Sequence, residues 1–156
     1  TKLNVQRMNR VDKTFKLKPE VKEALGSLPN VYYILVITEA WCGDAAHNIP
    51  ALEELTKQSE KLELRLILRD ENLDLMDLHL TNGGHSIPKA VILDKDFNVA
   101  GEWGPRPKPV QDMVMKNKST QAKTYKEFTK DVQLWYSKDK SKTIQQEFIE
   151  MLTHLD

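Results

Sequence analysis

The chain has 156 residues, a length that suits one domain able to bury roughly two-thirds of its unfolded surface. Its 23 Lys and Arg residues balance 23 Asp and Glu residues, so no charge excess points to nucleic acid or to an anionic membrane surface as a partner. Its apolar runs are far shorter than the roughly 20 residues that span a bilayer. With one cysteine, no disulfide can form within the chain, which indicates a reducing compartment, and we expect a cytoplasmic protein.

The N-terminal part is predicted to hold an arm with one helix, followed by a buried strand. Residues 1–16 are polar and mixed, and we predict that they are extended. Pro19 begins a short helix, because proline at the first helical position lacks only an N–H that would be unpaired anyway. Residues 31–37 are almost wholly apolar and β-branched or aromatic, which predicts a central strand covered on both faces.

The middle of the chain alternates between helical and strand patterns. A helix is expected to begin near Cys42, and the alternation of apolar and polar side chains over residues 62–68 predicts a second strand. The chain segment that connects these two strands is long enough for a right-handed crossover, which would make the strands parallel. A helix over residues 72–80 follows, and strands over residues 90–93 and 98–103 are predicted to pair as an antiparallel hairpin.

The residues from 105 to 156 are predicted to form a helical C-terminal extension. Three helical patterns cover residues 110–116, 123–136 and 143–155. Their apolar stripes are typical of packed core, and the alternative is a lid or a surface that docks a partner. Lys and Arg outnumber Asp and Glu between Arg106 and Lys142, so such a partner would be acidic, although a solvated helix face is the simpler interpretation.

Cys42 is the residue most capable of chemistry in this chain. It lies where the strand over residues 31–37 gives way to a helix. The first turn of a helix leaves N–H groups unpaired and favours a thiolate over a thiol. Lowering the pKa of a thiol from about 8.5 to about 7 makes it half ionised at neutral pH. The alternative is a small, half-buried apolar residue without reactivity.

The residues around Cys42 match a known family. The sequence Trp41-Cys42-Gly43, with Pro50 eight positions after the cysteine, resembles the active-site helix of thioredoxins. In that family Trp41 would pack partly over the sulfur and offer an apolar contact to a substrate. The match implies a nucleophilic thiol at Cys42.

Two later landmarks extend the resemblance. Ile87-Pro88 runs directly into a predicted strand, as the cis-proline of thioredoxins does, and Gly104 falls where the family has a glycine beside the site. The resemblance covers about residues 31–104 and implies a thioredoxin fold, an α/β fold with a mixed central sheet flanked by helices. We expect one domain over residues 1–156.

The sequence departs from the family pattern at the active site. Ala45 occupies the position of the second, resolving cysteine, and Asp44 replaces the intervening proline. Val36 stands where the family has a buried acid. The chain closely resembles a thioredoxin-like subgroup in which Trp-Cys-Gly-Asp-Ala replaces the Cys-x-x-Cys motif. The Asp44 carboxylate would oppose ionisation of a nearby thiol, yet interact favourably with the helix N-terminus.

Three further side chains are candidate proton or charge partners of the thiol. His85 lies three residues before Pro88 and would stabilise a thiolate when protonated, and Glu39 just precedes the site. His47 lies five residues past Cys42, so a helix directs it away. None of these residues has the tight spacing of a zinc motif, and we expect neither a metal nor a cofactor.

The sequence leaves three functional hypotheses open. In the first, Cys42 attacks a disulfide of a protein or small molecule beside the Ile87-Pro88 segment, and an external thiol completes the exchange. The chain would then be a thiol-disulfide oxidoreductase of the monothiol kind. In the second it is a binding module without turnover, and in the third a thiol sensor that is oxidised or capped.

Overall fold

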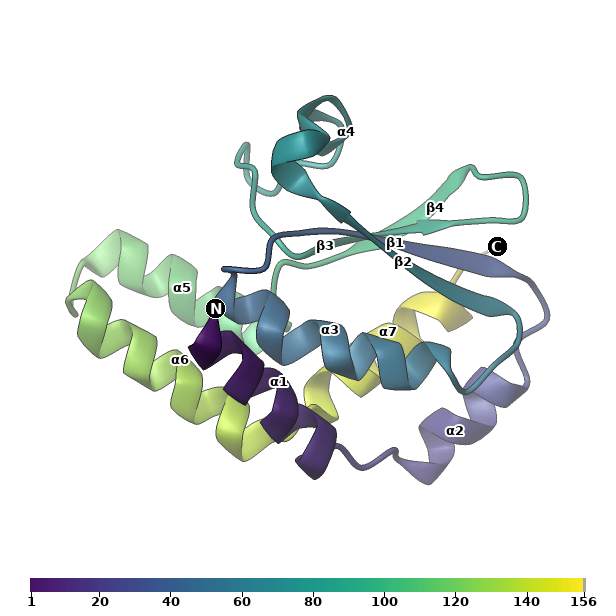
Figure 1. The fold of residues 1–156 in the computed structure, drawn as a ribbon, viewed down its shortest axis with the longest axis horizontal. Helices are drawn as coiled ribbons and strands as arrows, with labels where there is room; N and C mark the ends of the chain where they lie inside the picture. Colours follow the sequence, from purple (N-terminus) through teal and green to yellow (C-terminus); the bar gives the residue numbers. More distant parts are fainter. Residues whose placement is uncertain (156) are drawn as a thin grey trace.

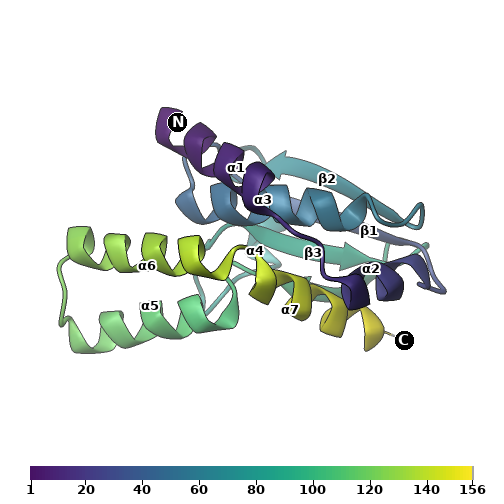
Figure 2. The same cartoon turned by 90° about the horizontal axis from the view of Figure 1, so that it is seen from below.

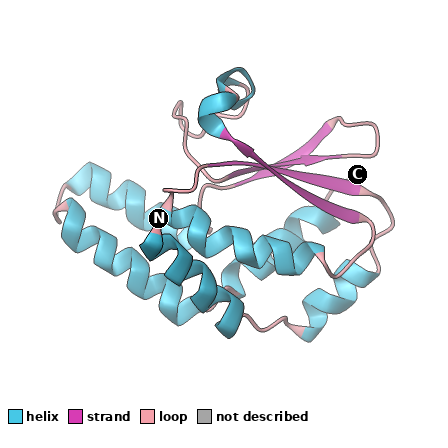
Figure 3. Ribbon diagram, in the orientation of Figure 1, coloured by secondary structure: helices cyan, strands magenta, loops and turns pink. Residues whose placement is uncertain are grey.

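A four-stranded mixed sheet forms the centre of the computed structural model, which describes residues 1–155 (Figures 1 and 3). Its strand order is β2-β1-β3-β4. β1 (Tyr32–Thr38) pairs in parallel with β2 (Leu62–Leu68) and antiparallel with β3 (Lys89–Leu93). β4 (Val99–Trp103) pairs antiparallel with β3. Together with the flanking helices, this sheet confirms the predicted fold class.

Helix α3 (Gly43–Thr56) makes the crossover from β1 to β2, as the sequence predicts. It lies on one side of the sheet together with α1 and α7, whereas α4 lies on the other side (Figure 1). Ile34 and Val36 of β1 and Leu52 and Leu55 of α3 are fully buried. On the other face of β1, Tyr33 and Leu35 are half-buried, whereas Ile37 is fully buried. Both faces of β1 are therefore covered in its C-terminal half, as expected for a central strand, and the second face is more open in its N-terminal half.

The prediction of an extended N-terminal arm is wrong. Residues of α1 (Lys2–Thr14) form a helix that packs on α3, and α2 (Pro19–Gly26) follows it as predicted. The buried residues of α1 are Asn4 and Val11, one of which is polar. Asn4 donates a hydrogen bond from Nδ2 to the Ala40 carbonyl at 3.0 Å, which pairs the buried amide. A polar residue in the buried stripe weakened the apolar periodicity that would have predicted the helix.

The segment between β2 and β3 is less helical than predicted. A 3₁₀ turn (Arg69–Glu71) leads into α4 (Leu73–Asp77), which is shorter than the expected helix over residues 72–80. The chain then reverses through reciprocal backbone hydrogen bonds between Thr81 and Gly84, of 2.9 and 3.0 Å. This turn and the fully buried Met76 fix the segment against the sheet.

Polar side chains also fasten this segment to the sheet. Lys89 is almost completely buried, and its Nζ lies 3.3 Å from Glu102 Oε2 and 3.1 Å from Thr81 Oγ1. His79 contacts Glu102 through Nδ1. Burial alone would raise the pKa of Glu102, but His79 and Lys89 together hold that pKa below its usual range. The buried cation is thus paired, as burial of a charge requires.

The three predicted C-terminal helices are confirmed as α5 (Lys108–Thr120), α6 (Tyr125–Asp139) and α7 (Lys142–Thr153). Figure 2 shows α5 and α6 side by side as a hairpin that extends beyond the sheet. Helix α7 instead returns to the main core, where Phe148 is fully buried. Over residues 1–155, no helix has the length and apolar character needed to cross a membrane.

Replacing Asn4 by alanine should lower the free energy of unfolding by about 1–2 kcal/mol, because the hydrogen bond to the Ala40 carbonyl is lost. Urea unfolding measures the effect. Asn9→Ala is the matched control: this asparagine is exposed on the same helix, and its replacement should change stability by less than about 0.5 kcal/mol. Equal effects of the two substitutions would contradict the anchoring of α1 by Asn4.

Candidate active site at Cys42

Cys42 is the N-cap residue of α3, and its sulfur takes part in two hydrogen bonds. Sγ accepts from the Ala45 N–H at 3.5 Å, which pairs one of the free donors of the first turn. The thiol donates to the Ile87 carbonyl at 3.4 Å. The side chain is 8% exposed. The structure therefore places the thiol between the helix start and the segment that precedes Pro88, with little contact to water.

Burial determines the protonation of this thiol. Desolvation raises the pKa of Cys42, and the negative charge of Asp44 raises it further. The N–H groups of Ala45 and Asp44 and the positive charge of Arg106 act in the opposite direction without offsetting the rise. The helix N-terminus therefore does not lower the pKa of Cys42 enough to offset burial. Cys42 is mainly a protonated thiol at neutral pH.

Pro88 and Gly104 lie next to each other beside the site. The Ile87–Pro88 and Gly104–Pro105 peptide bonds are both cis. Gly104 has a φ of +118°, and a Cβ atom there would lie 2.3 Å from the Pro88 carbonyl oxygen. Only glycine fits such a close approach of two backbone segments. Both residues were predicted to lie near the active sulfur, whereas no pattern in the sequence predicted the second cis bond.

Asp44 connects the active-site helix to the C-terminal helices. Its Oδ2 accepts a hydrogen bond from Arg106 Nε at 2.9 Å, and its Oδ1 accepts one from the Tyr136 hydroxyl at 2.7 Å. Arg106 also donates from Nη1 to Gln111 Oε1 at 2.8 Å. The sequence predicted Asp44 as a site residue but did not predict its partners Arg106 and Tyr136. They lie 62 and 92 residues later in the chain, beyond the reach of any local pattern.

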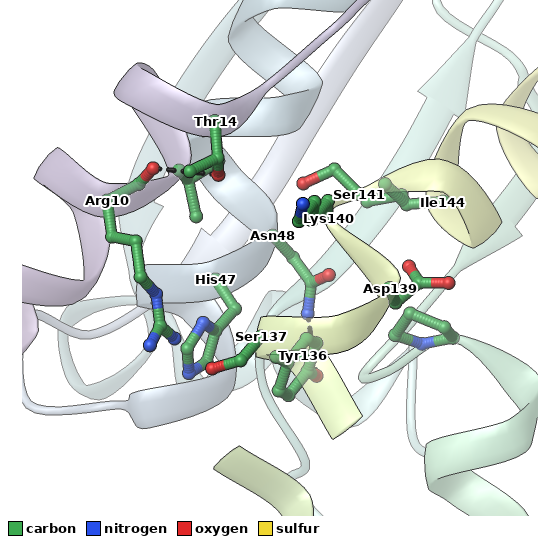
Figure 4. A pocket seen from close by; sticks show the side chains of 12 residues that line it. Arg10, Thr14, His47, Asn48, Tyr136, Ser137, Asp139, Lys140, Ser141 and Ile144 are labelled. Carbon is green, nitrogen blue, oxygen red and sulfur yellow. Dashed lines mark hydrogen bonds between the residues drawn. The ribbon is translucent and has the colours of Figure 1, made fainter. Parts of the chain in front are cut away.

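His47 packs behind Asp44 and away from the sulfur. It is 3% exposed, its ring stacks on Tyr136 with centroids 4.1 Å apart, and its Nε2 lies 2.6 Å from Gln133 Oε1. Burial lowers the pKa of His47 to about 4. Asn48 donates to the Tyr136 hydroxyl at 3.1 Å beside it. Figure 4 shows the small cavity that His47, Asn48 and Tyr136 help to line, whose volume of about 30 Å³ suits a water molecule.

The other two candidate partners, Glu39 and His85, contact the 3₁₀ turn and α4 instead of the sulfur. His85 Nε2 lies 2.6 Å from Asp77 Oδ1, and Glu39 Oε1 accepts from the Asp70 N–H at 2.9 Å. Within the described part of the chain, neither side chain hydrogen-bonds the sulfur of Cys42. Nor do any three His, Cys, Asp or Glu side chains among residues 1–155 group in a way that could hold a metal ion.

Two accessible features lie beside Cys42: the side chain of Trp41 and an apolar cleft. Trp41 is 57% exposed, and the guanidinium carbon of Arg69 lies 5.1 Å from the centroid of its ring. On another side, Cys42 lines a cleft of about 340 Å³ between α1, α3 and β2, which we call the α1–β2 cleft. Apart from Ala45, the aliphatic residues of this cleft were not predicted as site residues: Val5, Met8, Ala40, Ala46, Ile49, Leu66, Ile67 and Leu68.

The chain is similar to a protein family and to several solved structures. The family model described as Thioredoxin matches residues 1–126. A crystal structure of a protein of unknown function from Pseudomonas aeruginosa is 20% identical, with a TM-score of 0.71 over 96% of this chain and 81% of that chain. An HIV epitope scaffold is 21% identical, with a TM-score of 0.68 over 98% of this chain and 84% of that chain. At these identities the two structures show a shared fold, and no curated protein matches the chain.

Asp44→Asn should lower the free energy of unfolding by about 2 kcal/mol, since it removes the charge that Arg106 pairs with. It should also lower the pKa of Cys42, because the Asp44 charge disfavours the thiolate. Urea unfolding and the pH dependence of Cys42 alkylation, followed by intact mass, measure the two effects. Asp12→Asn, at an exposed position of α1, should change neither. An alkylation midpoint that Asp44→Asn leaves in place would contradict the electrostatic role of Asp44.

The stability of the wild type should fall between pH 6.5 and pH 4 more steeply than that of His47→Gln. The pKa of His47 is about 4 when folded and about 6.5 when unfolded, so the unfolded chain takes up the proton first as the pH falls. The extra loss should be about 3 kcal/mol at pH 4. His154→Gln, which replaces an exposed histidine, should leave the slope unchanged. Parallel curves for the wild type and His47→Gln would contradict the buried, neutral state of His47.

Proposed function

This chain belongs to the thioredoxin family, and from that premise we propose that Cys42 performs thiol-disulfide exchange as a monothiol. One observation supports the proposal above the others: Cys42 Sγ caps α3 while it faces the Ile87 carbonyl, immediately before Pro88. A disulfide that docks along residues 87 and 88, with Trp41 as an apolar contact, would meet this sulfur.

The reaction needs a second thiol from outside the chain. The Cys42 thiolate attacks one sulfur of a disulfide, a new S–S bond forms, and the other sulfur leaves as a thiolate that takes up a proton. Ala45 offers no sulfur to resolve the mixed disulfide. The product therefore persists until a partner protein or a small thiol releases it. We propose a reducing compartment such as the cytoplasm, which supplies that thiol.

The raised pKa of Cys42 makes this exchange slow at neutral pH. Only a small fraction of the thiol is ionised there, although a thiolate of high pKa is intrinsically the stronger nucleophile. The rate should consequently rise with pH until the thiol titrates. Slow formation, and release that depends on an external thiol, suit a protein that holds a partner rather than one that turns over rapidly.

A second candidate function is a binding module without exchange. The observation that favours it is the protonated thiol, 8% exposed and hydrogen-bonded to the Ile87 carbonyl. In this case Trp41 and the segment at Pro88 would dock a partner, and the sulfur would serve only to cap the helix. The two functions differ in whether Cys42 ever enters a mixed disulfide.

Incubation with glutathione disulfide should add one glutathione to the protein, at a rate that rises about tenfold per pH unit below the thiol pKa. Intact mass follows the adduct, added glutathione should reverse it, and Cys42→Ser should form none. Ala45→Cys is the matched gain of function, because its second thiol should displace glutathione from the adduct and leave an internal disulfide, two hydrogen atoms lighter than the dithiol. If glutathione disulfide forms no adduct while iodoacetamide alkylates Cys42, the binding module is the better account.

A further inference from the structure

We propose that the open edge of β2 pairs with the same edge of a second copy of this chain, so that two four-stranded sheets join into one continuous sheet. The contact is symmetric, because each copy presents the same strand to the other in the antiparallel direction. This inference goes beyond the proposed function and does not depend on it, since the contact uses neither the thiol of Cys42 nor the segment at Pro88.

β2 is an outer strand of the sheet, and one of its edges has no neighbour (Figure 2). The Tyr32 N–H of β1 donates to the Lys61 carbonyl at 2.9 Å, so the main chain of Lys61 and of every second residue after it points to β1. The main-chain groups of Leu64 and Leu66 therefore point to the open edge. Within residues 1–155, no turn, loop or side chain hydrogen-bonds the main chain of either leucine.

The side chains of β2 make this edge a template for another strand. Leu66 and Leu68 are 50% and 42% exposed, and Leu64 is half-buried. An outer strand with unpaired main-chain groups and exposed apolar side chains is a ready surface for strand addition. Only an extended backbone supplies N–H and C=O groups at the spacing of a strand. The occupant that fits this edge is consequently a strand rather than a small molecule.

The charges of β2 favour a second copy of the chain as that occupant. Glu63 and Arg65 alternate with the leucines and so lie on the other face of the strand, where Arg65 Nη2 is 2.5 Å from Glu63 Oε1. If two β2 strands pair antiparallel about Leu64, Glu63 of each copy lies opposite Arg65 of the other. Side chains directly opposite each other have Cβ atoms roughly 4.5–5.5 Å apart. The four charges would then alternate in sign around a ring, so the strand is complementary to itself.

Pairing about Leu64 also uses the unpaired main-chain groups. The two Leu64 residues would exchange both of their hydrogen bonds, and each Leu66 N–H would donate to the Leu62 carbonyl of the other copy. The Leu62 N–H would keep its own bond to the Ser59 carbonyl, which is 3.2 Å long. Each exposed Leu66 side chain would face Leu62 of the other copy and lose part of its contact with water.

The neighbouring registers lack this complementarity. Pairing about Glu63 or Arg65 would place like charges directly opposite each other, which is destabilising. Pairing about Leu66 would leave Arg65 opposite Ile67 and Glu63 opposite Arg69, which already pairs with an acid of its own chain. Charged residues at a sheet edge generally oppose pairing between copies. In β2 the order of the two charges instead selects one register.

Sedimentation equilibrium of the complete chain tests the proposal, with a reductant present so that no disulfide joins two Cys42 residues. We expect a reversible equilibrium between monomer and dimer. Because the interface consists mainly of one strand from each copy and is small, the dissociation constant should be micromolar.

Charge reversal locates the contact on β2. Arg65→Glu and Glu63→Arg each turn both opposite-charge contacts into like-charge contacts, so each should raise the dissociation constant by about tenfold or more. The double variant with both substitutions restores the alternation and should return the constant to about the wild-type value. Lys108→Glu is the matched control, because it reverses an exposed pair with Asp112 on α5 and should have no effect. Circular dichroism checks the fold of every variant.

Amide hydrogen exchange, measured residue by residue by NMR, reports the same contact without substitution. The N–H groups of Leu64 and Leu66 should exchange more slowly as the protein concentration rises, because they are hydrogen-bonded only in the dimer. β4 is the other outer strand of the sheet, and the exchange of the amides at its open edge should not depend on concentration.

Each contrary result would overturn the proposal. A chain that remains monomeric at millimolar concentration would leave the β2 edge to a strand of another protein. A dimer that survives both single variants, or whose protected amides lie outside β2, would use another surface. Single variants that are not rescued by the double variant would contradict the register about Leu64. None of these measurements depends on the chemistry of Cys42, so this proposal and the proposed function fail independently.

Discussion

The ion pair between Asp44 and Arg106 holds the active-site helix and the C-terminal helices together. Asp44 lies in the first turn of α3, two residues after the thiol, and also receives the Tyr136 hydroxyl of α6. Because both carboxylate oxygens have partners outside α3, the helical hairpin is fixed at the site itself. The residue that replaces the family's proline therefore joins the start of α3 to the helices added after β4.

This arrangement has a direct effect on the chemistry of Cys42. A charge-paired carboxylate close to the sulfur, and a thiol with little access to water, both favour the protonated form. The helix N-terminus acts against them through the N–H groups of Ala45 and Asp44 and is not sufficient. With Ala45 in place of a second cysteine, the site has no second thiol of its own that could resolve a mixed disulfide. What remains is one sulfur at the edge of an apolar cleft.

The sequence predicted the sheet and the position of the thiol because their signals are local. The apolar run from residue 31 and the alternation from residue 62 each lie within one strand, and Pro88 and Gly104 are single landmarks at family spacing. Helix α1 escaped prediction because its buried stripe includes Asn4, whose partner lies in a distant loop. The partners of Asp44 and the cleft at Cys42 depend on packing between remote segments, which no local pattern records.

Burial, rather than the helix N-terminus, sets the protonation state of the Cys42 thiol. Because Cys42 is the one cysteine of the chain, protein labelled with ¹³C at the cysteine Cβ gives a single resonance that titrates with the thiol. A midpoint above about 8.5, the value of an unperturbed thiol, is the result that this account predicts. A midpoint at or below about 7 would show an activated thiolate and contradict it.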